Sequence, residues 1–187
     1  MEIHVIRHSP VKFNKNRCYG SLDVPLANTF ENDVKKINKL LDNDYNIIYC
    51  SPKNRCFKLA NALELKNILT DQRLSELDFG DWEGKLWSDI NKKDLKSWME
   101  DFVKIPAGNG ESLNQMFIRV SGFIEDLRNE KFDKVLIITH SGVIRCIWGY
   151  LLEIPLKNIF KIPVGYFECF TFNLGEKREL DSIINLK

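Results

Sequence analysis

Hydrophobic residues along the chain fall into short unbroken runs that alternate with segments of helical spacing. Short apolar runs bounded by Gly, Pro or polar residues are typical of buried strands, whereas apolar residues three and four positions apart are typical of helices. The clearest run predicts a strand at 134–139. Similar runs predict further strands at 2–6, 46–50, 68–69, 166–173 and 179–186. Helical spacing predicts helices at 29–41, 55–65, 111–127 and 141–151, with helical pieces inside 85–104.

The order of these segments predicts the fold class. Strands that alternate with helices favour a mostly parallel central sheet with helices on both faces, so we expect a three-layer α/β/α fold. The two strands predicted after residue 166 alternate polar and apolar residues, which is typical of an antiparallel sheet edge. The length of 187 residues suits one domain that spans 1–187. An exposed edge strand fits both a monomer and a pair of chains, and the sequence leaves both open.

Charge and cysteine content narrow the function classes. Lys and Arg number 27 and Asp and Glu number 26, which gives a formal charge of +1. Without a global basic field we expect no nucleic-acid partner and no membrane partner. The five cysteines form no Cys-x-x-Cys pair and are odd in number, so we expect no disulfide framework, no zinc ribbon and a cytoplasmic location. No apolar run approaches the roughly 18 residues of a membrane span, and we expect no export signal.

Three predicted strands end in polar residues of related chemistry. Arg7 and His8 follow the first strand. Arg55 lies shortly after the second strand, and His140 follows the clearest one. Because the carboxyl ends of parallel strands meet at one edge of a sheet, we expect these four side chains to converge. Two guanidiniums and two imidazoles repel one another unless an anion lies among them, and phosphate matches their charge and paired donors.

The motifs that contain these residues resemble the histidine phosphatase superfamily, also called the phosphoglycerate mutase-like family. Its signature is an Arg-His after the first strand, a Ser-Pro-x-x-Arg after the second, a Leu-x-Glu-x-x-x-Gly-x-Trp-Glu-Gly segment and a late Thr-His-Gly or Ser-His-Gly. Two positions depart from the pattern, Ser9 and Ser141, where glycine or another small residue is common. The corresponding segments occur here in the same order, at 6–8, 51–55, 74–84 and 139–142.

The resemblance implies a nucleophile and a general acid. His8 would attack phosphorus and form a phosphohistidine, with its other ring nitrogen donating to a backbone carbonyl that fixes the tautomer. Glu76 would protonate the departing oxygen and then deprotonate the attacking water. Asp78 and Glu83 lie close by in the sequence, and only the family spacing favours Glu76 over them. Glu83 is expected, together with Trp82, to shape the loop.

Further residues are implied to bind the phosphoryl group. Arg7 and Arg55 would clamp its equatorial oxygens, and His140 would donate to one of them. Ser141, beside His140, is a further substrate-binding candidate. Asn14 lies in a long loop where the family often uses an asparagine to touch phosphate, although a solvated loop residue fits the pattern as well. The structural alternatives are an ion-paired arginine and a histidine that caps the next helix.

The loop sequence indicates a substrate class. Cys-Tyr-Gly-Ser-Leu-Asp-Val-Pro-Leu at 18–26 resembles the α-ribazole phosphatases of cobalamin assembly, and related small-molecule phosphatases have similar loops. We therefore expect a small phosphorylated metabolite, with α-ribazole 5′-phosphate or a cobamide 5′-phosphate as first candidate. Tyr19, Trp82 and Trp87 are candidates to stack on a flat leaving group, with core packing as the alternative. His4 lies inside the first strand and is assigned no role.

Three other functions stay open. Phosphoglycerate mutases of the superfamily carry a longer insertion before their Gly-Glu-Ser, whereas Gly84 and Gly110 are close in sequence here, which favours a phosphatase. A two-metal phosphatase needs paired ligands, but the chain has only three histidines, and two arginines at the predicted site would repel a cation. We therefore expect no metal and no cofactor. A non-catalytic phosphate-binding module is disfavoured because all five catalytic positions are retained.

Overall fold

The computed structural model describes residues 1–13, 16–42 and 44–186. Asn14, one of the predicted substrate-binding residues, lies outside the described residues. The described strands form one sheet in the order β3, β2, β4, β1, β5, β6. They are β1 (Glu2–Arg7), β2 (Ile47–Cys50), β3 (Ile68–Thr70), β4 (Lys134–Thr139), β5 (Cys169–Asn173) and β6 (Ser182–Leu186).

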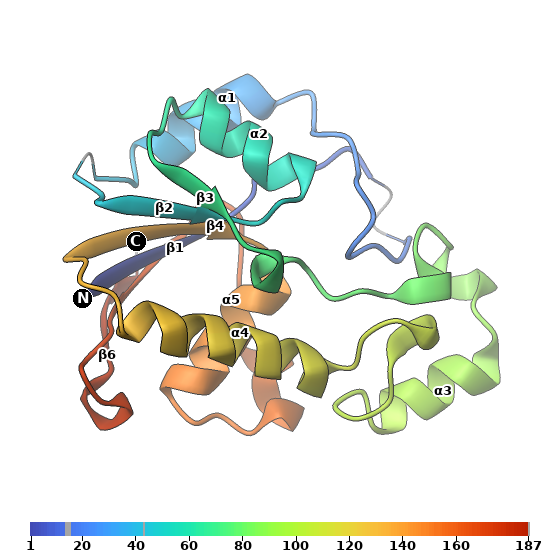
Figure 1. The fold of residues 1–187 in the computed structure, drawn as a ribbon. Coiled ribbons are helices and arrows are strands. Elements are labelled where there is room, and N and C mark those ends of the chain that lie inside the picture. Colours follow the sequence, from blue (N-terminus) through green and yellow to red (C-terminus); the bar gives the residue numbers. More distant parts are fainter. Residues whose placement is uncertain (14–15, 43, 187) are drawn as a thin grey trace.

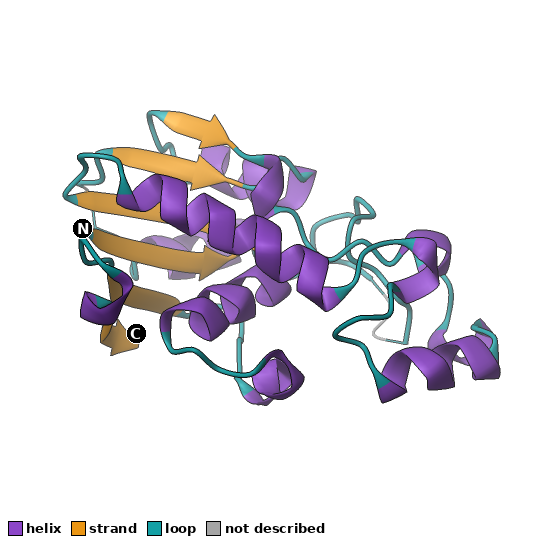
Figure 2. Ribbon diagram, turned by 60° about the horizontal axis from the view of Figure 1, so that its bottom comes forward, coloured by secondary structure: helices purple, strands orange, loops and turns teal. Residues whose placement is uncertain are grey.

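Strand direction places four carboxyl ends at one edge of the sheet. β1, β4, β2 and β3 run parallel, whereas β5 is antiparallel to β1 and β6 is antiparallel to β5. The antiparallel tail was expected from its alternating pattern. In Figure 2 the arrowheads of the parallel strands point toward the side of the molecule where the long loops lie.

Helices cover both faces of this sheet (Figure 1). α1 (Phe30–Asn38) and α2 (Asn54–Ala62) lie on one face, and α4 (Leu113–Arg128) and α5 (Ser141–Leu151) lie on the other. α3 (Lys92–Glu100) lies beyond the carboxyl ends of the strands. The structure therefore confirms the predicted α/β/α class with a mostly parallel sheet.

The period of two in β4 explains why the sheet has a core on each face. Val135 and Ile137 belong to the core that α4 and α5 cover, whereas Leu136 and Ile138 belong to the core that α1 and α2 cover. All four residues are fully buried. An unbroken apolar strand is stable in this position because helices remove both of its faces from water.

The segment 85–104 differs most from its sequence pattern. It forms a short 3₁₀ helix, Trp87–Asp89, followed by α3, which has no buried residue. α3 has no buried residue because it packs against loops and not against the sheet. Ile90 is buried as expected. The other apolar residues predicted to be buried are only partly so: Leu86, Leu95, Trp98 and Phe102.

α4 begins two residues later than expected. Ser112 caps the helix, because its Oγ accepts from Gln115 N at 3.2 Å while the Gln115 side chain accepts from Ser112 N at 2.8 Å. Glu111 therefore stays outside the helix and pairs with Arg119 at 2.6 and 2.8 Å. Arg119 also donates to the backbone oxygen of Glu76 at 3.4 Å, which ties the predicted general acid to α4.

Two expectations about the whole chain can be compared with the structure. All five cysteines are free and buried, which confirms the expected lack of a disulfide framework. Among the described residues, every helix is too short or too polar to cross a membrane.

Candidate active site

The register of the sheet brings three strand ends together. His8 N donates to Thr139 O at 2.9 Å, which extends the pairing of β1 and β4 beyond the end of β1. On the other side of β4, Ser51 N donates to Ile138 O at 2.9 Å, just past the end of β2. His140 directly follows β4. The residues after these three strands therefore lie side by side, as the sequence predicted.

His8 is 2% exposed, and its ring orientation is fixed. Nδ1 lies 2.7 Å from the carbonyl oxygen of Ser9, and because a carbonyl oxygen only accepts, Nδ1 carries the proton. Burial and the neighbouring charges of Arg55 and Arg7 lower the pKa of His8 well below 6.5, so the ring is neutral at neutral pH. His8 thus has the tautomer and charge state in which Nε2 presents a free lone pair.

His140 and Arg55 are almost fully buried beside His8. The two imidazole rings lie 5.1 Å apart, edge to face. Arg55 Nε donates to His140 Nδ1 at 3.2 Å, so His140 Nε2 carries the proton and donates to Ser51 Oγ at 2.8 Å. Burial, His8 and the nearby cations lower the pKa of His140. His140 occupies the N-cap position of α5 but makes no capping hydrogen bond, so the alternative of a helix-capping histidine is wrong.

The outer end of the Arg55 guanidinium contacts the loop that follows β1. Nη1 donates to Leu22 O at 2.8 Å, and Nη2 donates to Gly20 O at 2.5 Å. The same loop is joined to the start of α2, where Asn54 N donates to Asp23 Oδ1 at 3.1 Å. The Nη groups of Arg55, which we expected to bind phosphate, therefore donate to backbone oxygens of the loop in this structure. Arg55 thereby holds the loop in place.

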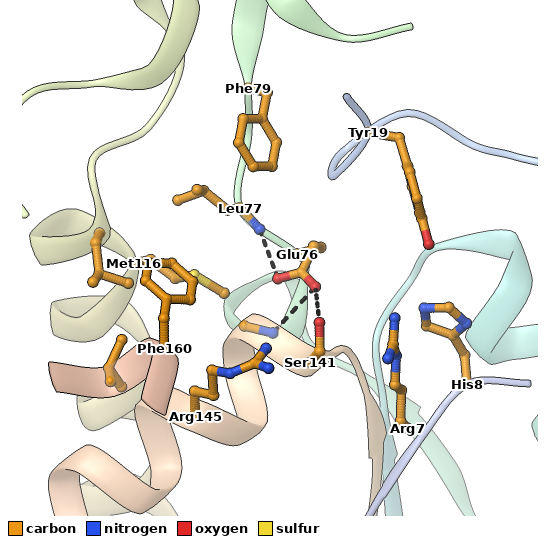
Figure 3. Close-up of a pocket in the computed structure, with 13 residues that line it drawn as sticks. Arg7, His8, Tyr19, Glu76, Leu77, Phe79, Met116, Ser141, Arg145 and Phe160 are labelled. Carbon is orange, nitrogen blue, oxygen red and sulfur yellow. Dashed lines mark hydrogen bonds between the residues drawn. The ribbon is translucent and has the colours of Figure 1, made fainter. Parts of the chain in front are cut away.

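Arg7 extends from the end of β1 toward the pocket (Figure 3). Its Nη1 donates to Val164 O at 3.3 Å, and its Nη2 donates to the Tyr166 hydroxyl at 3.1 Å. The guanidinium carbon lies 3.9 Å from the centre of the Tyr166 ring. Arg7 and His8 both line the pocket, and the positive charge of Arg7 acts on the His8 imidazole.

Glu76 faces the same pocket, and the N-terminus of α5 fixes its carboxylate (Figure 3). The carboxylate accepts from Gly142 N at 3.2 Å, Ser141 Oγ at 3.3 Å and Leu77 N at 3.1 Å. A Cβ atom at residue 142 would lie 2.2 Å from Glu76 Oε1, so a larger residue there would displace the Glu76 carboxylate. The predicted acid and the predicted Ser141 are therefore in direct contact.

Glu83, the other glutamate of the same motif, has a structural role. Its carboxylate accepts from four backbone N–H groups, those of Gly20 at 2.9 Å, Ser21 at 2.8 Å, Leu22 at 3.2 Å and Phe79 at 3.0 Å. Gly20 fits because a Cβ atom there would lie 1.9 Å from the backbone oxygen of residue 77. The expectation that Glu83 shapes the loop is confirmed.

A pocket of about 200 Å³ opens between these elements. The residues that line the pocket fall into a polar and an apolar set. Arg7, His8, Glu76 and Ser141 supply polar groups. Most of the remaining wall is apolar or aromatic and consists of Tyr19, Leu77, Phe79, Leu113, Met116, Ile159 and Phe160.

Arg145 and Phe160 also line the pocket, and the sequence patterns did not indicate them. Arg145 lies four residues after Ser141 on α5. Residues four apart lie on the same face of a helix, and this spacing from a predicted site residue was the signal that could have identified Arg145. Its Nε donates to Ile162 O at 2.9 Å, and burial lowers its pKa. Phe160 belongs to a 3₁₀ helix, Leu156–Lys161, that no hydrophobic pattern predicted.

The aromatic residues expected to stack on a leaving group fall into two sets. Tyr19 lines the pocket, and burial together with its contact to Tyr166 raises its pKa to about 12, so its hydroxyl stays protonated. Trp82 and Trp87 instead pack with Trp98 in a separate aromatic cluster. Both tryptophans therefore have a packing role, which was the alternative to stacking on a leaving group.

One group of described residues has ligand atoms close enough for a metal ion, and it lies at the opposite edge of the sheet. Glu2, His4 and Asp42 form this group. Lys134 Nζ already lies 3.2 Å from Asp42 Oδ2 and 3.9 Å from Glu2 Oε1, while His4 Nδ1 is hydrogen-bonded to the Tyr45 hydroxyl at 2.8 Å. The lysine supplies the positive charge there, so this cluster is an internal charge network.

Known proteins share this sequence pattern and this fold. Phosphoserine phosphatase 1 of Hydrogenobacter thermophilus is 26% identical over 195 residues, with 100% of this chain and 92% of that protein covered. The adenosylcobalamin/alpha-ribazole phosphatase of Escherichia coli is 24% identical over 184 residues, covering 92% of this chain and 91% of that one. The crystal structure of the alpha-ribazole phosphatase from Shigella flexneri matches the fold with a TM-score of 0.90 at 22% identity, over 100% of this chain and 96% of that one. The family model of the histidine phosphatase superfamily, branch 1, matches residues 3–181, and this chain is therefore a phosphatase of that superfamily.

Proposed function

We propose that this phosphatase hydrolyses phosphate monoesters without a metal ion, through a phosphohistidine on His8. The observation that carries the proposal is the state of His8, a buried neutral imidazole whose Nδ1 proton is held by the carbonyl of Ser9. Nε2 forms a bond to phosphorus as the bond to the ester oxygen breaks. Water then attacks the phosphohistidine, which releases inorganic phosphate and restores the neutral ring.

The cations around His8 stabilise the negative charge of the transferred group. Arg7 lines the pocket and is placed to contact phosphoryl oxygens directly. Arg55 adds positive potential at the His8 ring, and the neutral His140 beside it adds an N–H donor, which Ser51 Oγ accepts in this structure. Direct contact between Arg55 and phosphate requires its Nη donors to leave the two loop oxygens that they bind in this structure.

Glu76 acts as the general acid and base. It faces the pocket across from the nucleophile, and its carboxylate is oriented by three donors at the start of α5 and in its own loop. In the first step it gives a proton to the departing oxygen, and in the second it takes one from the attacking water. Of the two glutamates in the motif, only Glu76 lines this pocket among the described residues.

The donor set of the site supports a mechanism without a metal ion. His8 and His140 face two guanidiniums, which raise the positive potential at the position where a cation would bind. Metal sites in enzymes of this size are usually built from carboxylates and imidazoles with few cations nearby. We therefore expect full activity after treatment with a chelator.

The first substrate candidate is α-ribazole 5′-phosphate or a cobamide 5′-phosphate. A ribose 5′-phosphate that carries a flat benzimidazole would place its phosphate at His8 and its ring against the apolar wall. Phe79, Met116 and Phe160 offer the surface that such a ring would bury. Two relatives with this fold are named for α-ribazole phosphatase activity, which supports the assignment.

Arg145 favours a second candidate, a phosphomonoester with a carboxylate on its leaving group. Its Nη atoms make no hydrogen bond among the described residues, and it faces the pocket near Glu76 (Figure 3). A guanidinium in this position matches a carboxylate with paired donors. Phosphoserine fits this description, and a relative that aligns with the whole chain is named a phosphoserine phosphatase.

Steady-state phosphate release in the presence of EDTA tests both the metal-independent mechanism and the choice between the two substrate candidates. The substrates are α-ribazole 5′-phosphate, phosphoserine, 3-phosphoglycerate and p-nitrophenyl phosphate, with His8→Ala as the control. A kcat/KM for α-ribazole 5′-phosphate that exceeds the others by orders of magnitude supports the first candidate. A comparable preference for phosphoserine would replace it with the second.

Other outcomes of this experiment reject the chemistry itself. Activity that appears only after a metal ion is added would overturn the metal-independent mechanism. If no ester releases phosphate, with or without added metal, while a separate titration shows that inorganic phosphate binds, the protein is a non-catalytic module.

A further inference from the structure

The segment that precedes β5 contacts Arg7, and we propose that Tyr166 in this segment is a positioning residue for the Arg7 guanidinium. The inference rests on the proposed function, in which Arg7 binds phosphoryl oxygens. β5 is antiparallel to β1, and Cys169 lies opposite Ile6. The residues just before β5 therefore lie beside the end of β1, which brings a tyrosine from late in the chain to a strand end near the N-terminus.

Tyr166 holds the guanidinium in two ways. Its hydroxyl accepts from Arg7 Nη2 at 3.1 Å, and its ring centre lies 3.9 Å from the guanidinium carbon, within the range of a cation–π contact. Arg7 Nη1 donates to Val164 O at 3.3 Å, two residues earlier. Arg7 Nε is buried and has no hydrogen-bond partner among the described residues. The side-chain hydrogen bonds that the structure describes for Arg7 thus all go to 164–166.

The partners of Arg7 differ from those of the arginines that form ion pairs elsewhere in the fold. Arg7 forms no ion pair with a carboxylate among the described residues, and its contacts are an aromatic ring, a hydroxyl and a carbonyl. An ion pair would offset the charge that phosphate has to meet, whereas a ring and neutral oxygens orient the guanidinium and leave its charge in place. Arginines with structural positions do have acidic partners, in the pairs Arg73–Asp71, Arg119–Glu111 and Arg128–Asp181.

The surroundings of Tyr166 keep it in this position. Glu168 folds back over the segment, and its carboxylate accepts from Gly165 N at 2.7 Å. A Cβ atom at Gly165 would lie 2.6 Å from Glu168 Oε1, so the close approach depends on glycine. On its other side, Tyr166 interacts electrostatically with Tyr19, whose pKa it helps to raise, and its ring lies 6.0 Å from that of His8. Tyr166 therefore joins the segment before β5 to the loop after β1 across the Arg7 side chain.

Two substitutions at Tyr166 separate the ring from the hydroxyl. Tyr166→Leu removes both contacts to Arg7, and we expect the dissociation constant of inorganic phosphate to rise about tenfold, in the range of a partly desolvated cation–π contact. Tyr166→Phe keeps the ring and is expected to recover most of that affinity. Tyr45→Leu is the matched control, because Tyr45 bonds to His4 at the opposite edge of the sheet. It should lower thermal stability and leave the phosphate dissociation constant unchanged.

A double-mutant cycle with Arg7→Met tests whether Tyr166 acts through Arg7. If it does, Tyr166→Leu causes no further loss of phosphate affinity once Arg7 is replaced. Additive losses, or wild-type affinity in Tyr166→Leu, would overturn the inference. Phosphate binding is measured without turnover, so failure of the proposed function stays distinguishable. A protein that hydrolyses no ester but shows this coupling would reject the proposed reaction and retain the role of Tyr166.

Discussion

The two walls of the pocket are built in different ways. The wall that meets phosphate is built from strand ends. Arg7 is the last residue of β1 and His8 follows it, while His140, which follows β4, lies beside the His8 ring. The opposite wall comes from α4, α5 and the 3₁₀ helix, including Met116, Arg145 and Phe160. Sheet register fixes the first wall, while packing between helices and loops fixes the second. Strand pairing therefore determines where the catalytic side chains lie, whereas the surface for the leaving group depends on how helices and loops pack.

The largest expected effect is the loss of the nucleophile from the phosphate wall. We expect His8→Ala to lower kcat by at least about a thousandfold, because no other group replaces a nucleophile that forms a covalent intermediate. Phosphate release under saturating substrate measures the effect, and circular dichroism checks the fold. His4→Ala is the matched control, since His4 lies inside β1 and its ring is hydrogen-bonded to the Tyr45 hydroxyl, away from the pocket. Comparable turnover in His8→Ala and wild type would exclude the phosphohistidine.

The next effect separates the two glutamates of one motif. Glu76→Gln should lower kcat/KM by about a hundredfold or more for an ester with a poor leaving group, and far less for p-nitrophenyl phosphate, whose leaving group needs no proton. Glu83→Gln weakens the three hydrogen bonds that hold the loop at 20–22 and the fourth one from Phe79 N, so it should slow both substrates equally and lower Tm. An equal loss on both substrates in Glu76→Gln would end its role as general acid.

The same contrast explains what the sequence could predict. Motifs at strand ends were sufficient to bring Arg7, His8 and His140 to one edge, because parallel pairing leaves little choice of position. Pattern alone did not separate Glu76 from Glu83. The structure separates them because one carboxylate reaches the start of α5 and the other is enclosed by backbone N–H groups.

The leaving-group wall was largely beyond prediction. Phe160 lies in a short 3₁₀ helix without a hydrophobic period, and its approach to the pocket depends on tertiary packing. Trp87 was a candidate to stack on a leaving group, with core packing as the alternative, and the structure packs it against Trp98. Arg55 was predicted near phosphate, yet nothing in its motif shows that its outer donors bind the backbone of a loop more than thirty residues earlier.

A smaller effect is expected on the leaving-group wall. Substitutions there should change which substrate is preferred and leave the phosphoryl-transfer steps unchanged. Phe160→Ala removes aromatic surface, so kcat/KM for α-ribazole 5′-phosphate should fall about tenfold while that for phosphoserine changes little. Arg145→Met keeps much of the volume and removes the charge, and it should lower kcat/KM for phosphoserine by about tenfold or more. Ratios of kcat/KM between the two substrates measure both effects. If each variant slowed the two substrates equally, this wall would not determine specificity.

The smallest effect concerns the pH dependence of stability that His8 and His140 cause. The pKa of His8 and of His140 is lowered in the folded protein, whereas an unfolded histidine titrates near about 6.5. As pH falls below that value, the unfolded chain binds protons that the folded protein does not, so the free energy of unfolding decreases by roughly 1.4 kcal/mol per pH unit for each histidine. Above it, these two residues contribute no pH dependence. His8→Gln removes one of the two groups, and urea unfolding between about pH 6.5 and 5.5 should show a slope shallower by one proton. An unchanged slope would mean that His8 takes up its proton over the same pH range in the folded and the unfolded protein, which would contradict the lowered pKa of His8.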